Sequence, residues 1–442
     1  MDADKGGSRL ARQLSIVVAL ILILLPFDEL LTVWTASRFN HLDLFHIWKE
    51  ILITIMVAPT VWLALRHGLL KKTFFKSWLF LLIAAYGLLH LILGMWAFHD
   101  RQVNETALIY GLIINLRFLG FFLVCLMLSA LHPYLRRHWK FILLAPASVA
   151  VFFGLIQKLI LPTDFLKHFG YGPKTTPAYQ TVDSNLDYRR IQSSLRGANP
   201  FGAYLTFIIP GFILSLAKRR GLQLLAVAGA LVVLFYTYSR SAWVGLAISL
   251  VILGWLSLKN LSGRWAIVAV IVLAGGSIGI YSLRSNQVIQ DALLHTSVSS
   301  TSPQSSNALR SIAIKNGIRD VVHQPLGRGP GTAGPASFRS NHPARIAEDY
   351  YLQIGQEVGI LGLAIFLAIN MQVALSLWSQ RQDILARILL AALAGICFIN
   401  LVSHAWTDDT LSLLWWGLAG VSLGPVILQG RQGRNGRIQK SA

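Results

Sequence analysis

Three arginines lie at the ends of long apolar runs or inside them, where a charged side chain is costly and tends to face a cavity or a partner. Arg196 and Arg240 each stand just before such a run, and Arg117 lies within one. Guanidinium groups pair bidentately with phosphate oxygens, so several of them around one cavity would suit a pyrophosphate. The alternative is that each arginine anchors a helix end, with its charged head reaching toward water.

Two more arginines, Arg190 and Arg310, lie in the polar segments and are candidates to support the same anion. Asn199-Pro200 opens the apolar run that follows Arg196. Proline at the first helical position sacrifices no hydrogen bond, and the free amides of a first turn can face an anion. The predicted pyrophosphate-binding set is therefore Arg196, Arg240, Arg190 and Arg310.

Carboxylates and a histidine precede another apolar run. Glu348 and Asp349 are adjacent, and His342 stands six residues before Glu348. Such side chains can supply a general base, and we rank Glu348 first, His342 second and Asp349 third. The alternative is that the two acids cap the helix that follows, where negative charge favours the helix dipole. The two interpretations are compatible.

A third polar group lies between the last two apolar runs and contains His404, Trp406, Asp408 and Asp409. Taken singly, each of these residues is also typical of a solvated loop. Histidine and aspartate bind metals too, but the chain has no paired spacing such as His-x-x-x-His. No metal site and no cofactor are therefore predicted.

The composition indicates which kind of secondary structure carries these residues. Of the 442 residues, 54% are hydrophobic and 13% are charged, and the mean hydropathy is +0.57. A water-soluble globule could not hide this balance inside one core. Apolar runs of about 18 to 25 residues recur along the chain, the length that crosses roughly 30 Å of hydrocarbon as a helix. The expected spans are 13–33, 47–65, 77–97, 105–130, 140–161, 200–217, 221–238, 241–258, 265–283, 350–378, 386–403 and 410–429.

The fold class predicted from these runs is all-α, a polytopic membrane protein with about twelve transmembrane helices in one membrane domain, 1–442. Lysine and arginine gather in alternate loops, which the positive-inside rule places in the cytoplasm. Both termini are therefore expected to be cytoplasmic. More than half of the basic residues lie in these loops, so topology and contact with membrane lipid explain the net charge of +20. A nucleic acid partner is not expected.

Two long polar segments, 162–199 and 284–349, fall on the opposite side and are expected to face outward. The first is rich in Pro, Gly, Ser, Thr and Tyr and is interpreted as a structured loop. The second lies between spans nine and ten and contains an amphipathic stretch, expected to be a helix, from Ala308 to Val322. A loop this long is usually functional or disordered, and its amphipathic middle favours function.

Four motifs occur in a fixed order on this topology. They are Arg196-Gly-x-Asn-Pro-x-Gly202, Ser239-Arg240-Ser241, Gly327-Arg328-Gly329-Pro330-Gly331, and Tyr351-Leu352-Gln353 followed by Glu357-x-Gly359. In motifs and architecture the chain resembles the O-antigen ligase and polymerase superfamily, membrane glycosyltransferases of the GT-C type that use undecaprenyl-pyrophosphate-linked glycans. The sequence departs from the ligases at one position. Where they carry a His-Asn pair, whose histidine is proposed to activate the acceptor hydroxyl, this chain has Glu348-Asp349.

The resemblance implies transfer of a glycan from undecaprenyl pyrophosphate to a hydroxyl of a sugar or a lipid-linked acceptor, in cell-surface polysaccharide assembly. The expected location is the outer face of the cytoplasmic (inner) membrane of a bacterium. Direct attack would invert the anomeric centre and need one base, while arginines in place of a metal would stabilise the leaving group. A carboxylate such as Glu348 could serve as that base if burial raises its pKa.

Two alternatives stay open. The chain could be a polysaccharide polymerase of the same superfamily, because ligases and polymerases handle the same donor. It could also be a flippase or transporter for lipid-linked glycans. A transporter is expected to contain broken helices and polar residues near the membrane midplane, whereas most of the spans here are uninterrupted in sequence.

Overall fold

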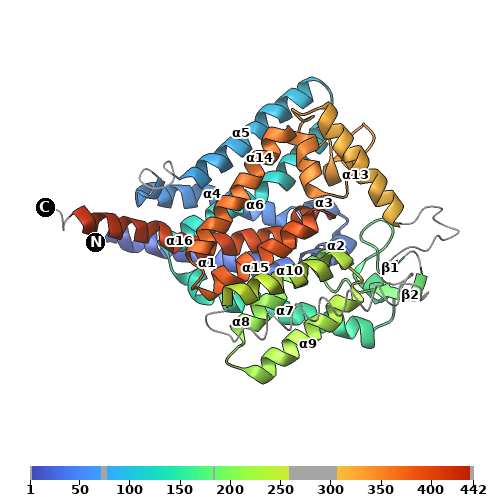
Figure 1. The fold of residues 1–442 in the computed structure, drawn as a ribbon, viewed down its shortest axis with the longest axis horizontal. Helices are drawn as coiled ribbons and strands as arrows, with labels where there is room; N and C mark the ends of the chain where they lie inside the picture. The colour runs from blue at the N-terminus through green and yellow to red at the C-terminus, as the bar shows by residue number, and fades with distance from the viewer. Residues whose placement is uncertain (1, 71–76, 183–184, 258–305, 439–442) are drawn as a thin grey trace.

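The computed structural model describes residues 2–70, 77–182, 185–257 and 306–438, which are mostly helical (Figure 1). The helices are α1 (Asp2–Leu24), α2 (Asp28–Phe39), α3 (Leu42–His46), α4 (Trp48–Arg66), α5 (Trp78–His99), α6 (Glu105–Leu131), α7 (Tyr134–Leu159), α8 (Ala198–Ser215), α9 (Arg220–Tyr236), α10 (Arg240–Ser257), α13 (Ser306–His323), α14 (Tyr350–Ser379), α15 (Ile384–Asn400) and α16 (Asp409–Ile438). Short 3-10 segments are η1 (Leu25–Phe27), η3 (Phe165–Phe169), η5 (Gly334–Arg339) and η6 (Ala405–Thr407). Strands β1 (Gln180–Val182) and β2 (Asn185–Arg190) pair as an antiparallel hairpin.

The helices follow the predicted apolar runs. Of the twelve predicted spans, eleven coincide with helices, and the ninth, 265–283, lies outside the described residues. Within the described part, eight helices are long and apolar enough to cross a membrane, and α9 and α15 are shorter apolar helices. The prediction of a multi-pass helical protein is thus supported, while the total of twelve spans stays a prediction.

The first span is longer than predicted and is interrupted. Its apolar stretch runs from Gly6 to Phe39 rather than over 13–33. Pro26 lies in η1, the 3-10 turn that separates α1 from α2, because proline lacks the amide hydrogen that an uninterrupted helix needs. The interruption leaves two acids, Asp28 and Glu29, buried in the first turn of α2.

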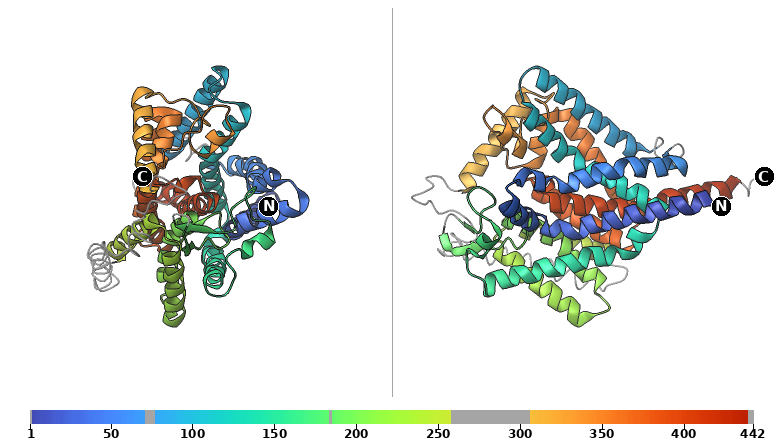
Figure 2. Two further views of the ribbon diagram at one scale, coloured as in Figure 1. Left: turned by 90° about the vertical axis from the view of Figure 1, so that its right-hand side faces the viewer. Right: turned by 180° about the vertical axis from the view of Figure 1, so that it is seen from behind.

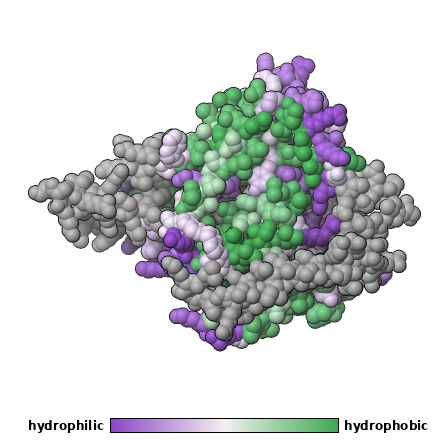
Figure 3. Space-filling model, in the orientation of Figure 1, coloured by the Kyte–Doolittle hydropathy of each residue, from purple (hydrophilic) through white to green (hydrophobic). Residues whose placement is uncertain are grey.

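The two ends of the helical bundle differ. Both chain termini lie at one end, and the β1–β2 hairpin and α13 lie at the other (Figures 1 and 2). We call this second end the loop end. Figure 3 shows hydrophobic side chains over the middle of one flank and hydrophilic ones along the edge formed by α13. Exposed leucines and tryptophans on the flank, such as Leu88 and Trp96 of α5, are typical of a surface that contacts lipid.

The core of the bundle lies where α6 packs along α16. A side chain at Gly420 would place its Cβ 2.5 Å from the carbonyl oxygen of Phe122, so glycine permits this close approach. Above this contact, Trp406, Trp415 and Trp416 are fully buried around Phe118. Trp406 belongs to η6, and its burial fixes the connection between α15 and α16 at the loop end.

Candidate active site

An acid, a base and an arginine from three separate segments meet at the loop end. Arg310 of α13 has its Nη2 3.6 Å from Oε2 of Glu348, the carboxylate that precedes α14. His404, from the connection between α15 and α16, interacts electrostatically with both. We call Arg310, Glu348 and His404 the Glu348 cluster. Its acid and its arginine were separate predictions from the sequence, and the fold brings them together.

The two potential proton acceptors of this cluster, Glu348 and His404, differ in exposure. Glu348 has a φ of 58°, the left-handed region that side chains other than glycine rarely adopt, and its side chain is 40% exposed. Such a backbone persists only where the surroundings hold it, and it is common at functional sites. Nε2 of His404 is buried without a hydrogen-bond partner. Burial lowers the pKa of His404, so the imidazole is neutral at pH 7.

A second cluster lies four residues further along the same connection. Asp408 interacts electrostatically with Arg196, which stands just before α8, and Arg196 also interacts with Glu29. We call Arg196, Glu29 and Asp408 the Arg196 cluster. Burial, together with the carboxylate of Asp409, raises the pKa of Asp408 to about 6, although the Leu411 amide and the arginines oppose the shift. The side chain of Arg196 is exposed, so its guanidinium remains accessible to an anionic ligand.

Next to the Arg196 cluster lies a buried network of closely paired charges. Lys49 is fully buried, with Nζ 2.9 Å from Oδ2 of Asp28 and 2.8 Å from Oδ2 of Asp409. Arg117 donates to Oε1 of Glu50 and to the carbonyl oxygen of Thr407, both at 2.8 Å, and also pairs with Asp409. These five side chains are named the Lys49 network. Because it holds Thr407 and Asp409, it fixes the connection that carries His404 and Asp408.

Arg117 therefore takes the structural role that the sequence left open. Buried charges in a protein interior are usually paired, and every charge partner of Arg117 comes from a neighbouring helix or turn. Charge pairing of this kind orients the backbone more than it recognises a ligand.

Two predicted pyrophosphate ligands lie beside another turn. Nε of Arg190 donates to the carbonyl oxygen of Thr237 at 2.8 Å, and its Nη2 bonds Oδ1 of Asn199. The amide of Ile191 donates to the carbonyl oxygen of Tyr236 at 3.0 Å. These bonds tie β2 and the start of α8 to the turn before α10, where Arg240 is the first helical residue and is half-buried. Arg190 therefore lies against the turn that leads into Arg240.

The remaining two base candidates are engaged elsewhere. Nε2 of His342 donates to the carbonyl oxygen of Arg101 at 3.0 Å, which ties the polar segment to the connection between α5 and α6. Asp349 accepts from the amide of Leu352 at 2.9 Å and is the N-cap of α14. Burial raises its pKa, and only 8% of the residue is exposed. For Asp349 the geometry is that of the helix cap, the alternative given by the sequence.

The glycine motif at 327–331 clasps a break in α14. Residues Val358 and Gly359 are non-helical inside α14. The amide of Gly329 donates to the carbonyl oxygen of Glu357 at 2.8 Å, and the amide of Ile360 donates to Pro325 at 2.9 Å. The carboxylate of Glu357 accepts from Asn115 at 2.6 Å and from the Gly331 amide at 2.8 Å. The break is therefore closed by protein hydrogen bonds.

Positive φ angles explain why this clasp is made of glycine. Gly327, Gly329 and Gly331 have φ of 82°, 97° and 89°. A Cβ at Gly327 would lie 2.5 Å from the amide nitrogen of Gly359, so both conformation and space exclude a side chain. The clasp, which lies between Arg310 and Glu348 in the sequence, anchors the polar segment to α14.

His404 is the site residue that sequence reasoning did not select. It was noted only as one member of a polar group whose residues are also typical of a loop. Nothing local pairs it with Glu348, since the two residues belong to different connections. For metal ions, no group of three or more His, Cys, Asp or Glu side chains with suitable geometry occurs among the residues that the structure covers.

These features describe a multi-pass helical membrane protein with a cluster of acids, arginines and a histidine at one end of its bundle. Residues 225–367 match the O-antigen ligase family. The match runs from α9 through α10, α13 and the glycine clasp into α14. It confirms the predicted resemblance to the O-antigen ligase and polymerase superfamily over these residues. No curated protein matches the chain. The match indicates an enzyme of the ligase or polymerase type that acts in polysaccharide assembly on lipid-linked glycans.

Proposed function

We propose that the chain is an inverting, metal-independent glycosyltransferase that moves a glycan from undecaprenyl pyrophosphate to a hydroxyl acceptor at the outer face of the bacterial inner membrane. One observation carries the proposal. The connection between α15 and α16 places His404 beside Glu348 and Asp408 beside Arg196. The same short connection therefore contacts both a possible base, Glu348, and an accessible arginine, Arg196. A glycosyl transfer needs this pair of functions at one anomeric carbon.

In the proposed reaction, the acceptor oxygen attacks the anomeric carbon while the bond to the pyrophosphate oxygen breaks. Glu348 accepts the hydroxyl proton, and the neutral imidazole of His404 is the second acceptor beside it. Arg310 orients Glu348 through their 3.6 Å contact. His404 thus takes the supporting role that the sequence assigned to His342.

Negative charge grows on the pyrophosphate as the bond breaks, and positive groups already in place lower the energy of that state. Arg196 is the leading candidate because its side chain is exposed at the loop end. Arg190 and Arg240 are assigned to the second, adjoining part of the donor site. Asp408 balances Arg196 when no donor is bound.

The polymerase remains an alternative within the family. The flippase is less well supported, because transporters use the free backbone groups of broken helices to bind substrates or ions. The break in α14 has its amides and carbonyl groups bonded to the glycine clasp instead. Those groups are therefore occupied.

The test is transfer of a labelled glycan from undecaprenyl pyrophosphate by the purified protein in lipid nanodiscs with EDTA. Arg196→Gln and Glu348→Gln are each expected to lower the rate at least about 100-fold, the usual contribution of a general base or a charge-stabilising group. Arg381→Gln and Glu105→Gln are matched controls at exposed positions and should retain the rate. If the wild-type protein makes no product but moves the lipid across a liposome bilayer, the transferase proposal fails and the flippase replaces it.

A further inference from the structure

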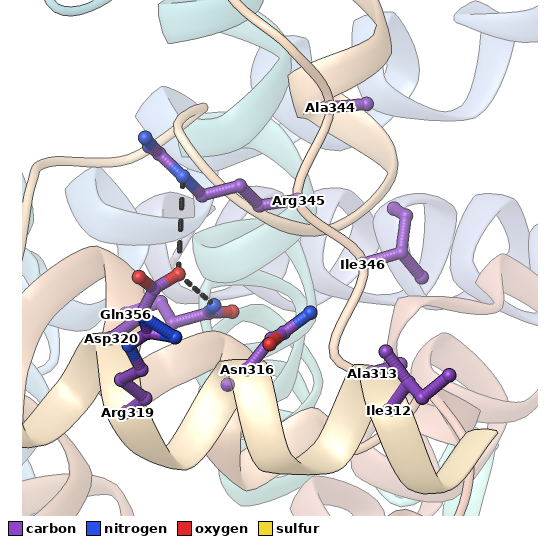
Figure 4. A pocket seen from close by; sticks show the side chains of 10 residues that line it. Ile312, Ala313, Asn316, Arg319, Asp320, Ala344, Arg345, Ile346 and Gln356 are labelled. Carbon is purple, nitrogen blue, oxygen red and sulfur yellow. Dashed lines mark hydrogen bonds and ion pairs between the residues drawn. The ribbon is translucent and has the colours of Figure 1, made fainter. Parts of the chain in front are cut away.

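A cavity of about 520 Å³ lies between α13 and the segment that leads into Glu348. Asn316, Arg319 and Asp320 line it from α13, Arg345 and Ile346 line it from the facing segment, and Gln356 of α14 closes it (Figure 4). Its volume is within the range of small-molecule sites. It is separate from the Glu348 cluster, although both are built on α13.

Several polar groups of this cavity lack a partner. Within the described residues, the side chains of Asn316 and Arg319 make no hydrogen bond or ion pair, and both are exposed. Gln356 is only 4% exposed, and its Nε2 donates to Oδ2 of Asp320 at 2.9 Å while its Oε1 has no partner. A buried amide oxygen without a donor costs free energy, which a hydrogen bond from a ligand hydroxyl would offset.

The cavity also carries a surplus of positive charge. Asp320 is its single carboxylate, and three guanidinium groups stand around it. Arg328 pairs with Asp320 at 3.1 Å, whereas Nε of Arg345 is 3.9 Å away. Burial and the charge of Arg328 both lower the pKa of Arg345, as expected of a guanidinium without a full counter-charge. An anionic ligand would supply that charge.

One wall of the cavity is apolar and is formed by Ile312, Ala313 and Ile346. Amide and guanidinium groups opposite an apolar wall suit a sugar ring, which offers hydroxyl groups at its edge and C–H groups on its faces. Asn316 lies six residues and Arg319 nine residues beyond Arg310 on α13, so the polar part of the cavity lies about 9 to 14 Å along the helix from Arg310, and the apolar wall lies between them. That distance places it beyond the reacting sugar.

We propose that this cavity is a subsite for an acidic saccharide unit of the acceptor, a sugar bearing a carboxylate or a phosphate group. The inference rests on the proposed function, because it takes the Glu348 cluster as the point of transfer. Arg345 and Arg319 bind the anionic group, and Asn316 and Gln356 bind hydroxyl groups. The subsite holds the acceptor while the neighbouring sugar presents its hydroxyl to Glu348.

Saturation-transfer difference NMR on the protein in nanodiscs tests this subsite with four probes: glucuronic acid, glucose 6-phosphate, methyl glucoside, and inorganic phosphate as a competitor. Both acidic sugars should bind better than methyl glucoside. Each charge-assisted hydrogen bond contributes about tenfold or more, so the Arg319→Gln/Arg345→Gln double variant should lose at least that factor in affinity. Arg381→Gln, at the other end of α14, is the matched control and should bind like the wild type.

The outcomes separate this inference from the proposed function. Glu348→Gln should still bind the acidic sugars while losing transfer, so binding without any transfer by the wild type would overturn the function and leave the subsite standing. The subsite is overturned if the double variant, with an unchanged melting temperature, keeps the binding of the wild type. It is also overturned if phosphate competes but no sugar gives a signal. A preference for the carboxylate or the phosphate probe identifies the anionic group.

Discussion

Two groups of charges both include a residue at the connection between α15 and α16, and they differ in burial and in how closely their charges are paired. In the Lys49 network, Lys49 is fully buried and contacts two carboxylates at 2.9 and 2.8 Å. In the Glu348 cluster, Arg310 and Glu348 are 31% and 40% exposed, are 3.6 Å apart, and stand beside a histidine whose Nε2 has no partner. Lys49 is thus buried and closely paired, whereas Arg310 and Glu348 are partly exposed and loosely paired.

The difference separates support from chemistry. A buried charge without its partner is strongly destabilising, so the Lys49 network holds the backbone of η6 in one place. A half-exposed, loosely paired acid keeps its lone pairs available for a substrate hydroxyl. Substitutions in the two groups should therefore affect different properties, folding in one and turnover in the other.

The largest expected effect is on stability. Lys49→Met leaves the buried carboxylate of Asp28 without its cation and leaves Asp409 with Arg117 alone, and it should cost about 3 to 5 kcal/mol of unfolding free energy. Thermal unfolding followed by tryptophan fluorescence would measure the loss. The double variant Lys49→Met/Asp28→Asn is the control and should recover part of it. A melting temperature equal to that of the wild type would remove the contrast between the two groups.

The next effect is on rate. His404→Ala should lower the transfer rate about 100-fold, within the usual range for general acid–base groups, and leave the melting temperature unchanged. His342→Ala is its control, because His342 contacts the Arg101 carbonyl group rather than Glu348. The assignment is reversed if His342→Ala is the slower variant.

A smaller effect follows from the pKa of Asp408, which is raised from 3.8 to about 6. As the pH falls through 6, protonation removes a negative charge beside Arg196, so the KM for the donor should decrease. In Asp408→Asn, the KM should stay level between pH 5 and pH 7.5, a range chosen to bracket that pKa. Steady-state kinetics at several pH values would measure both, and parallel profiles would contradict the assignment.

The same shift has a consequence for stability. Because the folded pKa lies above the ordinary value, the contribution of Asp408 to stability is fully present below about pH 3.8 and is lost as the pH rises through about 6. Asp408→Asn should therefore raise the melting temperature at pH 7.5 relative to the wild type.

The smallest effect is at the start of α14. Asp349→Ala removes the N-cap bond to Leu352 and should cost about 1 kcal/mol of unfolding free energy without changing kcat. Asp349→Asn keeps a capping side chain and should retain most of the stability. A large fall in kcat for Asp349→Asn would return this carboxylate to the list of bases.

The sequence predicted the helices well, because long apolar runs leave the chain no other way to satisfy its backbone in a membrane. It missed the break at Pro26, which sits inside a run that is apolar on both sides. It also missed the break at Val358 and Gly359, because glycine is common in transmembrane helices and the partner of the break is the distant segment around Pro325.

The candidate site was predicted in part. Glu348, Arg196 and Arg310 were selected by residue type and by their place beside apolar runs, and all three belong to clusters at the loop end. The pairing of Glu348 with His404 depends on how α14 packs against η6, which no local pattern encodes. The buried ion pairs of Lys49 were not predicted for a similar reason, since its partners belong to α2 and α16.

The glycine clasp has a further consequence for how the protein can vary. It pins the long polar segment to α14 through backbone bonds that do not depend on the side chains to either side. Substitutions of cavity-lining residues such as Asn316 and Arg319 would therefore change the cavity while the clasp keeps the break of α14 in place. Under the proposed function, the choice of acceptor could therefore change from one homologue to the next while the backbone around α14 stays the same.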